Sequence, residues 1–302
     1  MSAPLVLTAV AGKGGAGPIR ELPRHIGDSL AGLGAEPGNL DWLEEGRAFD
    51  LTFEGLDLEA ARRSLGNLGR MQTVDFAIQA LNGRHKRVFI ADLESTIIEN
   101  ELLDDLAGSV GLREEVSEIT ARAMRGDVDF AAALRERVGL LRGLPANVLE
   151  EAARGIRYTP GAETLLRTLR ARGVRTALVS GGFSVFTSRV RDALGFDTDH
   201  ANTIEVQDGC LTGRVREPVL DAAGKARVLE SLAAEVGGPE NVLAVGDGAN
   251  DLRMIAAAGL GVAYRGKPAL RAAAAAAIDH GDLTTLLFFQ GYRREEFRAG
   301  DL

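Results

Sequence analysis

The sequence predicts an α/β protein with a Rossmann-like parallel sheet, a small helical insertion and a separate α/β unit at the N-terminus. Three observations carry this prediction. The chain has 302 residues, enough for about two domains of ordinary size. After residue 86, short strands that are apolar on both faces alternate with helical patterns, as in parallel sheets covered by helices. Residues 101–155 carry helical periodicity only.

The N-terminal unit is expected over residues 1–80, from a mixture of strand and helix patterns. The expected elements are strands over 5–10 and 48–53, helices over 18–33 and 58–68, and a turn over 34–39. The turn rests on Pro37 and Gly38, because these residues commonly break regular structure. A boundary near Leu81 then leaves residues 81–302 for the larger domain.

The larger domain shows its strands most clearly at three places. Apolar runs predict strands over 87–91, 175–179 and 242–245, each separated from the next by helical patterns. The alanine-rich run 271–277 predicts a plain helix, since alanine is the strongest helix former.

Composition and charge exclude several classes of function. The chain holds 35 basic and 43 acidic residues, a net charge of −8, with no basic stripe, which argues against binding nucleic acid. No apolar stretch approaches the roughly 20 residues of a membrane span, and the N-terminus lacks the pattern of a signal peptide. The single cysteine, Cys210, fits a reducing, cytoplasmic setting.

A glycine-rich string follows the first expected strand. Residues 12–17 match the G-x-G-x-x-G pattern of dinucleotide-binding loops. Pro18 and Ile19 stand where a phosphate-binding P-loop would have Lys-Ser or Lys-Thr, and Glu36 lies in a turn segment instead of at a strand end. A plain glycine loop therefore explains the string better than a nucleotide site.

Each of the three strands in the larger domain ends in a polar motif. Because ligands of parallel α/β sheets gather at the carboxyl ends of the strands, we expect these motifs to meet in space. The first contains Asp92 and Glu94, which alternation places on one side of an extended segment. Two such carboxylates can divide the work of nucleophile or metal ligand and of proton transfer. A solvated loop with incidental acids is the alternative.

The other two motifs supply groups suited to a phosphate and a metal. Ser180 and Gly181 precede a helical pattern, so backbone N–H groups there could hold an anion. Asp247 and Asp251 follow the third strand and suit Mg²⁺, which takes a few carboxylates together with water and phosphate oxygens. Lys225 could neutralise a phosphate. Each motif alone is also compatible with an ordinary turn or a solvated surface.

Taken together and in this order, the motifs resemble those of the haloacid dehalogenase-like phosphatases, and within them the phosphoserine phosphatases. The resemblance covers about residues 88–282 and includes residues 119–141, 143–145 and 261–268. It implies that the helical stretch 101–155 is a small cap. Residues 1–80 resemble more weakly the ACT-like domain of longer family members.

The resemblance implies a Mg²⁺-dependent hydrolysis of O-phospho-L-serine, the last step of serine biosynthesis, with a small-molecule substrate, and it allows for a homodimer. Asp92 would attack phosphorus and form an aspartyl-phosphate. The metal would be held by Asp92, Asp247 and the backbone carbonyl of Glu94, and Asp251 would support its ligands. Ser180, Gly181 and Lys225 would bind the transferring phosphate.

The cap would supply the contacts to the rest of the substrate. By the same resemblance, Glu101 would take the substrate ammonium and Arg137 its carboxylate, while Met124 and Phe130 would close the pocket. Asn250 would be a further substrate-binding residue. Spacing alone is equally consistent with Met124 and Phe130 in a helix core and with Glu101 and Arg137 as surface charges.

One residue departs from the family pattern, which has aspartate where this chain has Glu94. Glutamate has the same acid–base chemistry but is longer by one methylene, and catalytic geometry is sensitive to such a change. A glutamate here also resembles the phosphoserine–homoserine phosphotransferases, which pass the phosphoryl group to another hydroxyl. Two alternatives therefore stay open: transfer to homoserine or action on another small phosphomonoester, and a non-catalytic protein that senses amino acids.

Overall fold

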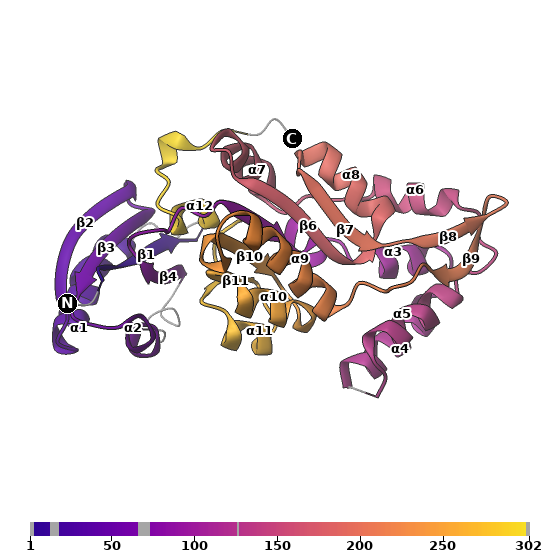
Figure 1. Cartoon of the computed structure of the whole chain (residues 1–302), viewed down its shortest axis with the longest axis horizontal. Coiled ribbons are helices and arrows are strands. Elements are labelled where there is room, and N and C mark those ends of the chain that lie inside the picture. The colour runs from indigo at the N-terminus through magenta and orange to yellow at the C-terminus, as the bar shows by residue number, and fades with distance from the viewer. Residues whose placement is uncertain (1–2, 13–17, 66–72, 126, 300–302) are drawn as a thin grey trace.

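The central part of the computed structural model is a parallel sheet between two layers of helices (Figure 1). The structure describes residues 3–12, 18–65, 73–125 and 127–299. The strands of this part are β5 (Val88–Ala91), β6 (Arg175–Phe183), β7 (Thr198–Asn202), β10 (Val242–Gly246), β11 (Leu260–Tyr264) and β12 (Ala276–Ile278). The helices are α7 (Ala162–Ala171), α8 (Ser184–Leu194), α9 (Ala222–Glu235), α10 (Leu252–Ala257), α11 (Pro268–Ala273) and α12 (Thr285–Phe289).

These strands lie in the order β12-β11-β10-β5-β6-β7, and every neighbouring pair is parallel. Alternate residues of one strand serve opposite faces of the sheet. On β5, Phe89 and Ala91 pack in a core with α7, α8 and α12, whereas Val88 and Ile90 pack in a core with α9, α10 and α11. Burial on both faces explains why the strands are apolar throughout, and the predicted α/β class is confirmed.

A helical insertion follows β5, where the sequence predicts only helices. Its members are α3 (Leu102–Ser109), α4 (Arg113–Arg125), α5 (Phe130–Gly139) and α6 (Asn147–Arg154). A two-stranded hairpin, β8 (Ile204–Gln207) and β9 (Cys210–Val215), extends from β7 and lies beside these helices in Figure 1. Cys210 in β9 forms an isolated bridge with Pro145, so the hairpin contacts the connection between α5 and α6.

The described residues among the first 80 form an antiparallel sheet that packs with two α-helices. The elements are β1 (Leu5–Ala11), α1 (Leu22–Gly32), β2 (Glu36–Glu44), β3 (Ala48–Glu54), α2 (Leu58–Leu65) and β4 (Val74–Ala80). Their strand order is β2-β3-β1-β4, and the order of elements along the chain is βαββαβ. One face of this sheet packs with both helices in a core of its own, which includes Leu7, Phe49 and Ile78.

The two sheets join at one seam. Strand β4 pairs antiparallel with β12, with Ala77 opposite Ala276, so the described residues form one ten-stranded sheet. Asp75 reinforces the seam, because its buried carboxylate accepts hydrogen bonds from the backbone N–H groups of Asp279 (2.8 Å), His280 (3.1 Å) and Gly281 (2.7 Å). The position of the last sheet strand thus depends on a side chain from the first 80 residues.

Two predictions of local structure are wrong. Residues 36–44 form strand β2 instead of the turn expected over 34–39; the turn itself falls at Gly34, whose φ is +81°. Pro37 and Gly38 are tolerated because β2 is the edge strand of the sheet and its register shifts between Pro37 and Leu40.

The second error concerns the alanine-rich run. Helix α11 ends at Ala273, and Ala276 and Ala277 continue as strand β12, paired with β11 on one side and β4 on the other. Tertiary pairing therefore overrides the helix propensity of alanine. The glycine string falls largely on residues 13–17, outside the described residues. Within the part of the chain that is described, no helix combines the length and apolarity needed to cross a bilayer.

We expect Asp75→Asn to lower the free energy of unfolding by about 1–3 kcal/mol, because an amide cannot accept from all three N–H groups and leaves buried donors unpaired. Denaturant unfolding measures the change. Asp28→Asn is the matched control, since Asp28 is exposed on α1 and its substitution should change the free energy by less than about 0.5 kcal/mol. Equal losses in the two variants would contradict this account of the seam.

Candidate active site

Three carboxylates meet at the carboxyl ends of β5 and β10. Asp92 directly follows β5, and its N–H donates to the carbonyl of Val245 at 3.0 Å, which fixes the two strand ends together. Asp247 and Asp251 follow β10. One oxygen from each of the three carboxylates lies within 4.8 Å of the others. The structure therefore brings together the three acidic side chains that the motifs predict to meet.

A buried lysine lies among these acids. Lys225 is fully buried in the first turn of α9, and its ammonium donates to Asp92 Oδ1 at 2.6 Å and to Asp251 Oδ1 at 2.7 Å. The helix begins here because Asp221 accepts a hydrogen bond from the N–H of Gly224 at 2.8 Å. The sequence predicts Lys225 near a phosphate, and the structure places it between two carboxylates at the expected edge of the sheet.

Asp251 organises the loop after β10. Its Oδ2 accepts from the N–H groups of Asp247 at 3.2 Å and Gly248 at 3.1 Å, while its Oδ1 binds Lys225. A Cβ on Gly246 would lie 2.5 Å from the Asp251 carboxyl, so only glycine fits the end of β10. The buried Asp251 thus orients the backbone that carries Asp247.

Burial and mutual repulsion shift the acidity of this cluster. Burial raises the pKa of Asp92, the Asp251 charge raises it further, and Lys225 opposes both. Burial alone would lower the pKa of Lys225, but the charges of Asp251 and Asp92 outweigh burial and raise it, so the ammonium stays charged. Burial also raises the pKa of Asp247 to about 6.

The predicted anion loop, Ser180–Gly182, lies within the last four residues of β6, which extends to Phe183 instead of ending at residue 179 as predicted. Ser180 is buried, and its Oγ accepts from the N–H of Gly182 at 2.9 Å. Asn202 holds the loop from β7 by donating to the carbonyl of Gly181 at 2.9 Å. A Cβ on Gly181 would lie 2.8 Å from the ring of Phe130, so this cap residue packs directly against the loop.

Glu94 lies between the anion loop and the cap. Its Oε1 accepts from the N–H of Leu102 at 2.7 Å, and its Oε2 lies 3.2 Å from the position of a Cβ on Gly182. Burial raises the pKa of half-buried Glu94 to about 8, and the neighbouring Glu101 charge adds to the rise. In the metal-free protein, this shift of the pKa favours the protonated carboxyl at neutral pH, which is the form that can donate a proton.

The remaining predicted residues lie at different distances from this centre. Ser95 Oγ donates to Glu101 Oε1 at 2.8 Å, which places Glu101 beside the first motif. Burial lowers the pKa of Arg137 on α5, and the charges of Asp104, Glu94 and Glu101 counteract it, so these groups share one region. Asn250 lies in the short turn after β10, and Met124 belongs to α4, with its side chain outside the described part.

The acidic group could hold a divalent cation. Oxygen donors are what hard cations prefer, and three carboxylates within 4.8 Å supply them. Asp92 uses only Oδ1 in its contact with Lys225, whereas Asp251 also uses Oδ2 to accept from two backbone N–H groups, so Asp92 and Asp247 are the carboxylates best placed to hold the cation. Three negative charges facing one buried ammonium leave a net charge that a cation would balance.

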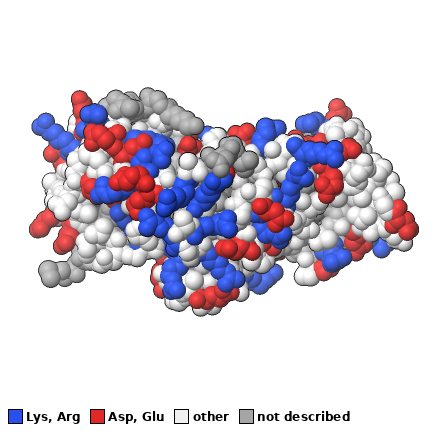
Figure 2. All heavy atoms as spheres, turned by 90° about the horizontal axis from the view of Figure 1, so that it is seen from above, with Lys and Arg blue, Asp and Glu red and all other residues white. Residues whose placement is uncertain are grey.

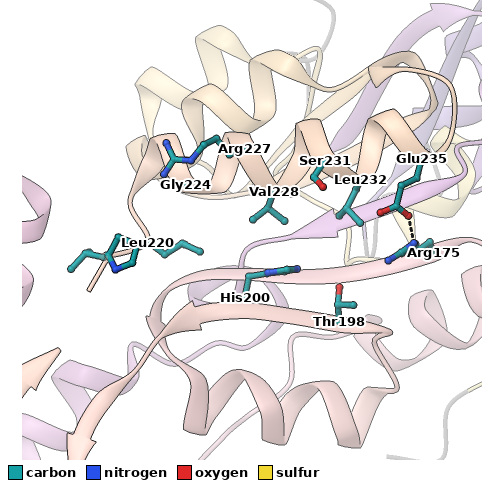
Figure 3. A pocket seen from close by; sticks show the side chains of 12 residues that line it. Arg175, Thr198, His200, Leu220, Gly224, Arg227, Val228, Ser231, Leu232 and Glu235 are labelled. Carbon is teal, nitrogen blue, oxygen red and sulfur yellow. Dashed lines mark hydrogen bonds and ion pairs between the residues drawn. The ribbon is translucent and has the colours of Figure 1, made fainter. Parts of the chain in front are cut away.

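A pocket beside α9 is a separate feature. A pocket of about 400 Å³ lies between α9 and β7, with Thr198 and His200 on one side and Val228 and Leu232 on the other (Figure 3). It contains none of the predicted site residues. On the molecular face in Figure 2, basic and acidic side chains are interspersed, in keeping with the absence of a basic stripe in the sequence.

Three groups at the site escaped the sequence analysis. Lys267 is half exposed at the start of α11 and lies 3.9 Å from Asp247 Oδ2. Asn202 positions Gly181, and the N–H of Leu102 binds Glu94. Lys267 lies in the segment 261–268 that contributes to the family resemblance, where no role was assigned to it, whereas a backbone N–H and a single asparagine carry no signal in one sequence.

Comparisons with known proteins agree with this geometry. Residues 89–256 match the family model of haloacid dehalogenase-like hydrolases. The chain is 44% identical over 84% of its length to a phosphoserine phosphatase of Streptomyces coelicolor, of which it covers 63%, and 43% identical over 76% of its length to one of Archaeoglobus fulgidus, of which it covers 68%. The chain thus spans about two thirds of these relatives.

A solved structure matches nearly the whole chain. A haloacid dehalogenase family hydrolase, t0658, from Salmonella enterica superposes with a TM-score of 0.81 at 30% identity, covering 94% of this chain and 98% of its own. The similarity therefore includes the first 80 residues as well as the carboxylate cluster. By its matched family model, its relatives and its strand-end carboxylates, this chain belongs to the haloacid dehalogenase-like hydrolases.

Proposed function

We propose that this chain is a Mg²⁺-dependent phosphatase that hydrolyses O-phospho-L-serine to L-serine and phosphate. The observation that carries the proposal is the buried Asp92 carboxylate, bonded to Lys225 at 2.6 Å and placed beside the Ser180–Gly182 loop. The identity of 44% to a curated phosphoserine phosphatase supports the same substrate. Phosphoryl transfer needs charge neutralisation, to which Lys225 contributes one positive charge beside Asp92.

In this proposal, Asp92 attacks phosphorus while the P–O bond to the serine oxygen breaks, which forms an aspartyl-phosphate. Glu94 gives its proton to the departing serine oxygen and later takes one from the water that hydrolyses the intermediate. Asp92, Asp247 and the Glu94 carbonyl would hold Mg²⁺, which supplies positive charge beside the phosphate. Lys225, Ser180 and Gly181 would bind the phosphate oxygens.

The cap residues give the proposal its substrate. Arg137 lies near Glu94 and Glu101 and is half-buried, so a substrate carboxylate would meet a partly desolvated guanidinium. Glu101 would bind the ammonium, and Phe130, packed against Gly181, would exclude water from the phosphate. These roles of the cap residues belong to the proposal. We also propose a division into residues 1–80, with an ACT-like fold, and residues 81–302.

The decisive experiment is phosphate release from O-phospho-L-serine in the presence of Mg²⁺. We expect turnover by the unmodified protein and a loss of about four orders of magnitude in Asp92→Asn, because the amide cannot attack phosphorus. Acid-trapped phosphoenzyme should form only with Asp92 present. Turnover retained in Asp92→Asn would overturn the mechanism, and phosphohomoserine formed on addition of homoserine would replace hydrolysis by transfer.

Substrate recognition gives a second prediction. Arg137→Ala should raise KM for phosphoserine about 10- to 100-fold, the value of a lost charge-assisted contact of about 1.5–3 kcal/mol. Phosphoethanolamine, which lacks the carboxylate, is the matched control substrate, and its KM should stay within about twofold. Steady-state kinetics on both substrates separates the two results. An equal loss on both substrates would remove Arg137 from carboxylate recognition.

The raised pKa of Glu94 predicts a pH dependence of stability in metal-free protein. An unfolded glutamate loses its proton near its ordinary pKa of 4.5, whereas the folded protein keeps it to about 8. Between pH 4.5 and pH 8, the folded state binds more protons at Glu94 than the unfolded state does. The contribution of protonated Glu94 to the free energy of unfolding therefore falls as the pH rises, by up to about 1.4 kcal/mol per pH unit.

Denaturant unfolding in a chelator between pH 4.5 and 8 checks this expectation. The stability of the unmodified protein relative to Glu94→Gln should decline with rising pH, since glutamine does not titrate. Glu114→Gln, at an exposed position in the first turn of α4, provides the flat reference. A constant difference between the unmodified protein and Glu94→Gln would show that Glu94 ionises normally.

A further inference from the structure

The carboxyl of Glu94 spans from the cap to the anion loop. Its Oε1 accepts the hydrogen bond from Leu102 N–H at 2.7 Å, at the start of α3. Its Oε2 lies 3.2 Å from the position of a Cβ on Gly182, where Ser180 Oγ lies 3.1 Å from the same point. One oxygen is thus fixed by the cap helix, and the other faces the loop predicted to hold the phosphate.

The donor of this hydrogen bond has a special place in its helix. Leu102 is the first residue of α3, and Glu101 is the N-cap residue, whose carbonyl accepts from Asp105 N–H at 2.9 Å. The N–H groups of a first helical turn have no acceptor within the helix. Glu94 supplies the acceptor for Leu102, and the positive end of the helix favours the electron-rich oxygen that it meets.

The length of the glutamate side chain matters for this bridge. Glu94 follows a backbone that leaves β5 in an extended conformation, with φ −71° and ψ 141°, and Ser95 then turns with φ +52°. An aspartate at this position would end about one methylene short, on the order of 1 Å. A carboxyl that short could not keep both the contact with Leu102 and the position beside Gly182.

We propose that the N–H of Leu102 is a positioning group for the proposed reaction: it holds Oε1 of Glu94 so that Oε2 is the oxygen presented to the leaving group. The inference rests on the proposed phosphatase function. When the P–O bond to an alkoxide breaks and the Asp92–phosphorus bond forms, the proton on Oε2 passes to the departing oxygen. The water that attacks the aspartyl-phosphate returns a proton to the same carboxylate.

A consequence is that the position of the Glu94 carboxyl, the proposed general acid, depends on the position of the cap. Helix α3 is the first helix of the cap, and Phe130 on α5 packs against Gly181 of the anion loop. A displacement of α3 moves the acceptor side of Glu94 with it, whereas Asp92 and Lys225 are fixed to the sheet. Proton transfer therefore depends on the position of the cap, and attack by Asp92 does not.

Leu102→Pro tests the proposal, because proline removes the N–H and is accepted at the first position of a helix. Glu101 before it has φ −111° and ψ 91°, which is outside the α region that a following proline disfavours. The matched control is Leu102→Ala, which also removes the buried side chain but keeps the N–H. Both variants are assayed as full-length chains with Mg²⁺.

The readout is the ratio of two activities. Phosphoserine has an alkoxide leaving group that needs a proton, whereas p-nitrophenyl phosphate and acetyl phosphate release stable anions. We expect the ratio of kcat/KM on phosphoserine to kcat/KM on the activated substrate to fall about 100-fold in Leu102→Pro, the scale of general acid catalysis, because kcat/KM reports the step in which the leaving group departs. In Leu102→Ala the ratio should keep its unmodified value. Equal ratios in the two variants would overturn the proposal.

Glu94→Asp provides an independent measurement should Leu102→Pro not fold. It retains the carboxyl but not the reach to Leu102, so the same ratio should fall; an unchanged ratio would overturn the inference. Failure of the proposed function is distinguishable. If the unmodified protein hydrolyses activated substrates but not phosphoserine, the substrate assignment is wrong, and the ratio is then measured with whichever alkyl phosphate the protein hydrolyses.

Discussion

The whole site depends on one buried ammonium. Lys225 has no exposed surface, and burying a charge costs several kcal/mol unless partners compensate it. Asp92 and Asp251 provide that compensation at 2.6 and 2.7 Å. Removing Lys225 would leave the buried carboxylates of Asp92 and Asp251 without the cation that lies between them, so the stability of each of these three side chains depends on the others. They come from β5, α9 and the loop after β10, and therefore fix the relative positions of these elements.

This constraint extends outward from the lysine in two directions. The second oxygen of Asp251 accepts hydrogen bonds from the N–H groups of Asp247 and Gly248, which orients the backbone that carries the Asp247 carboxylate. Asp92 is tied to β10 because its N–H donates a hydrogen bond to the carbonyl of Val245. The same lysine keeps the site only partly neutralised, because one ammonium faces three carboxylates. A dianionic phosphate would be repelled there unless a cation joined the cluster, which connects metal binding to substrate binding.

The centre of the molecule was predictable from sequence, and its edges were not. Asp92, Asp247 and Asp251 follow apolar strands, and parallel topology alone brings strand ends together. Strand β2 was missed because Pro37 and Gly38 usually break strands, and only the edge position of β2 admits them. The run that ends in β12 was missed because alanine carries no strand signal; its conformation follows from pairing with β4 and β11.

The sequence also identified Glu94 as the unusual acid but could not say what its length achieves. Its additional methylene is used to reach the N–H of Leu102, a backbone group that no motif records. A shorter acid would have to be positioned by the sheet-bound loop alone, as Asp92 is. In the proposed reaction, the general acid Glu94 is held by the first helix of the insertion, whereas the nucleophile Asp92 is held by Lys225. The two proposed catalytic groups are thus positioned by different elements of the fold.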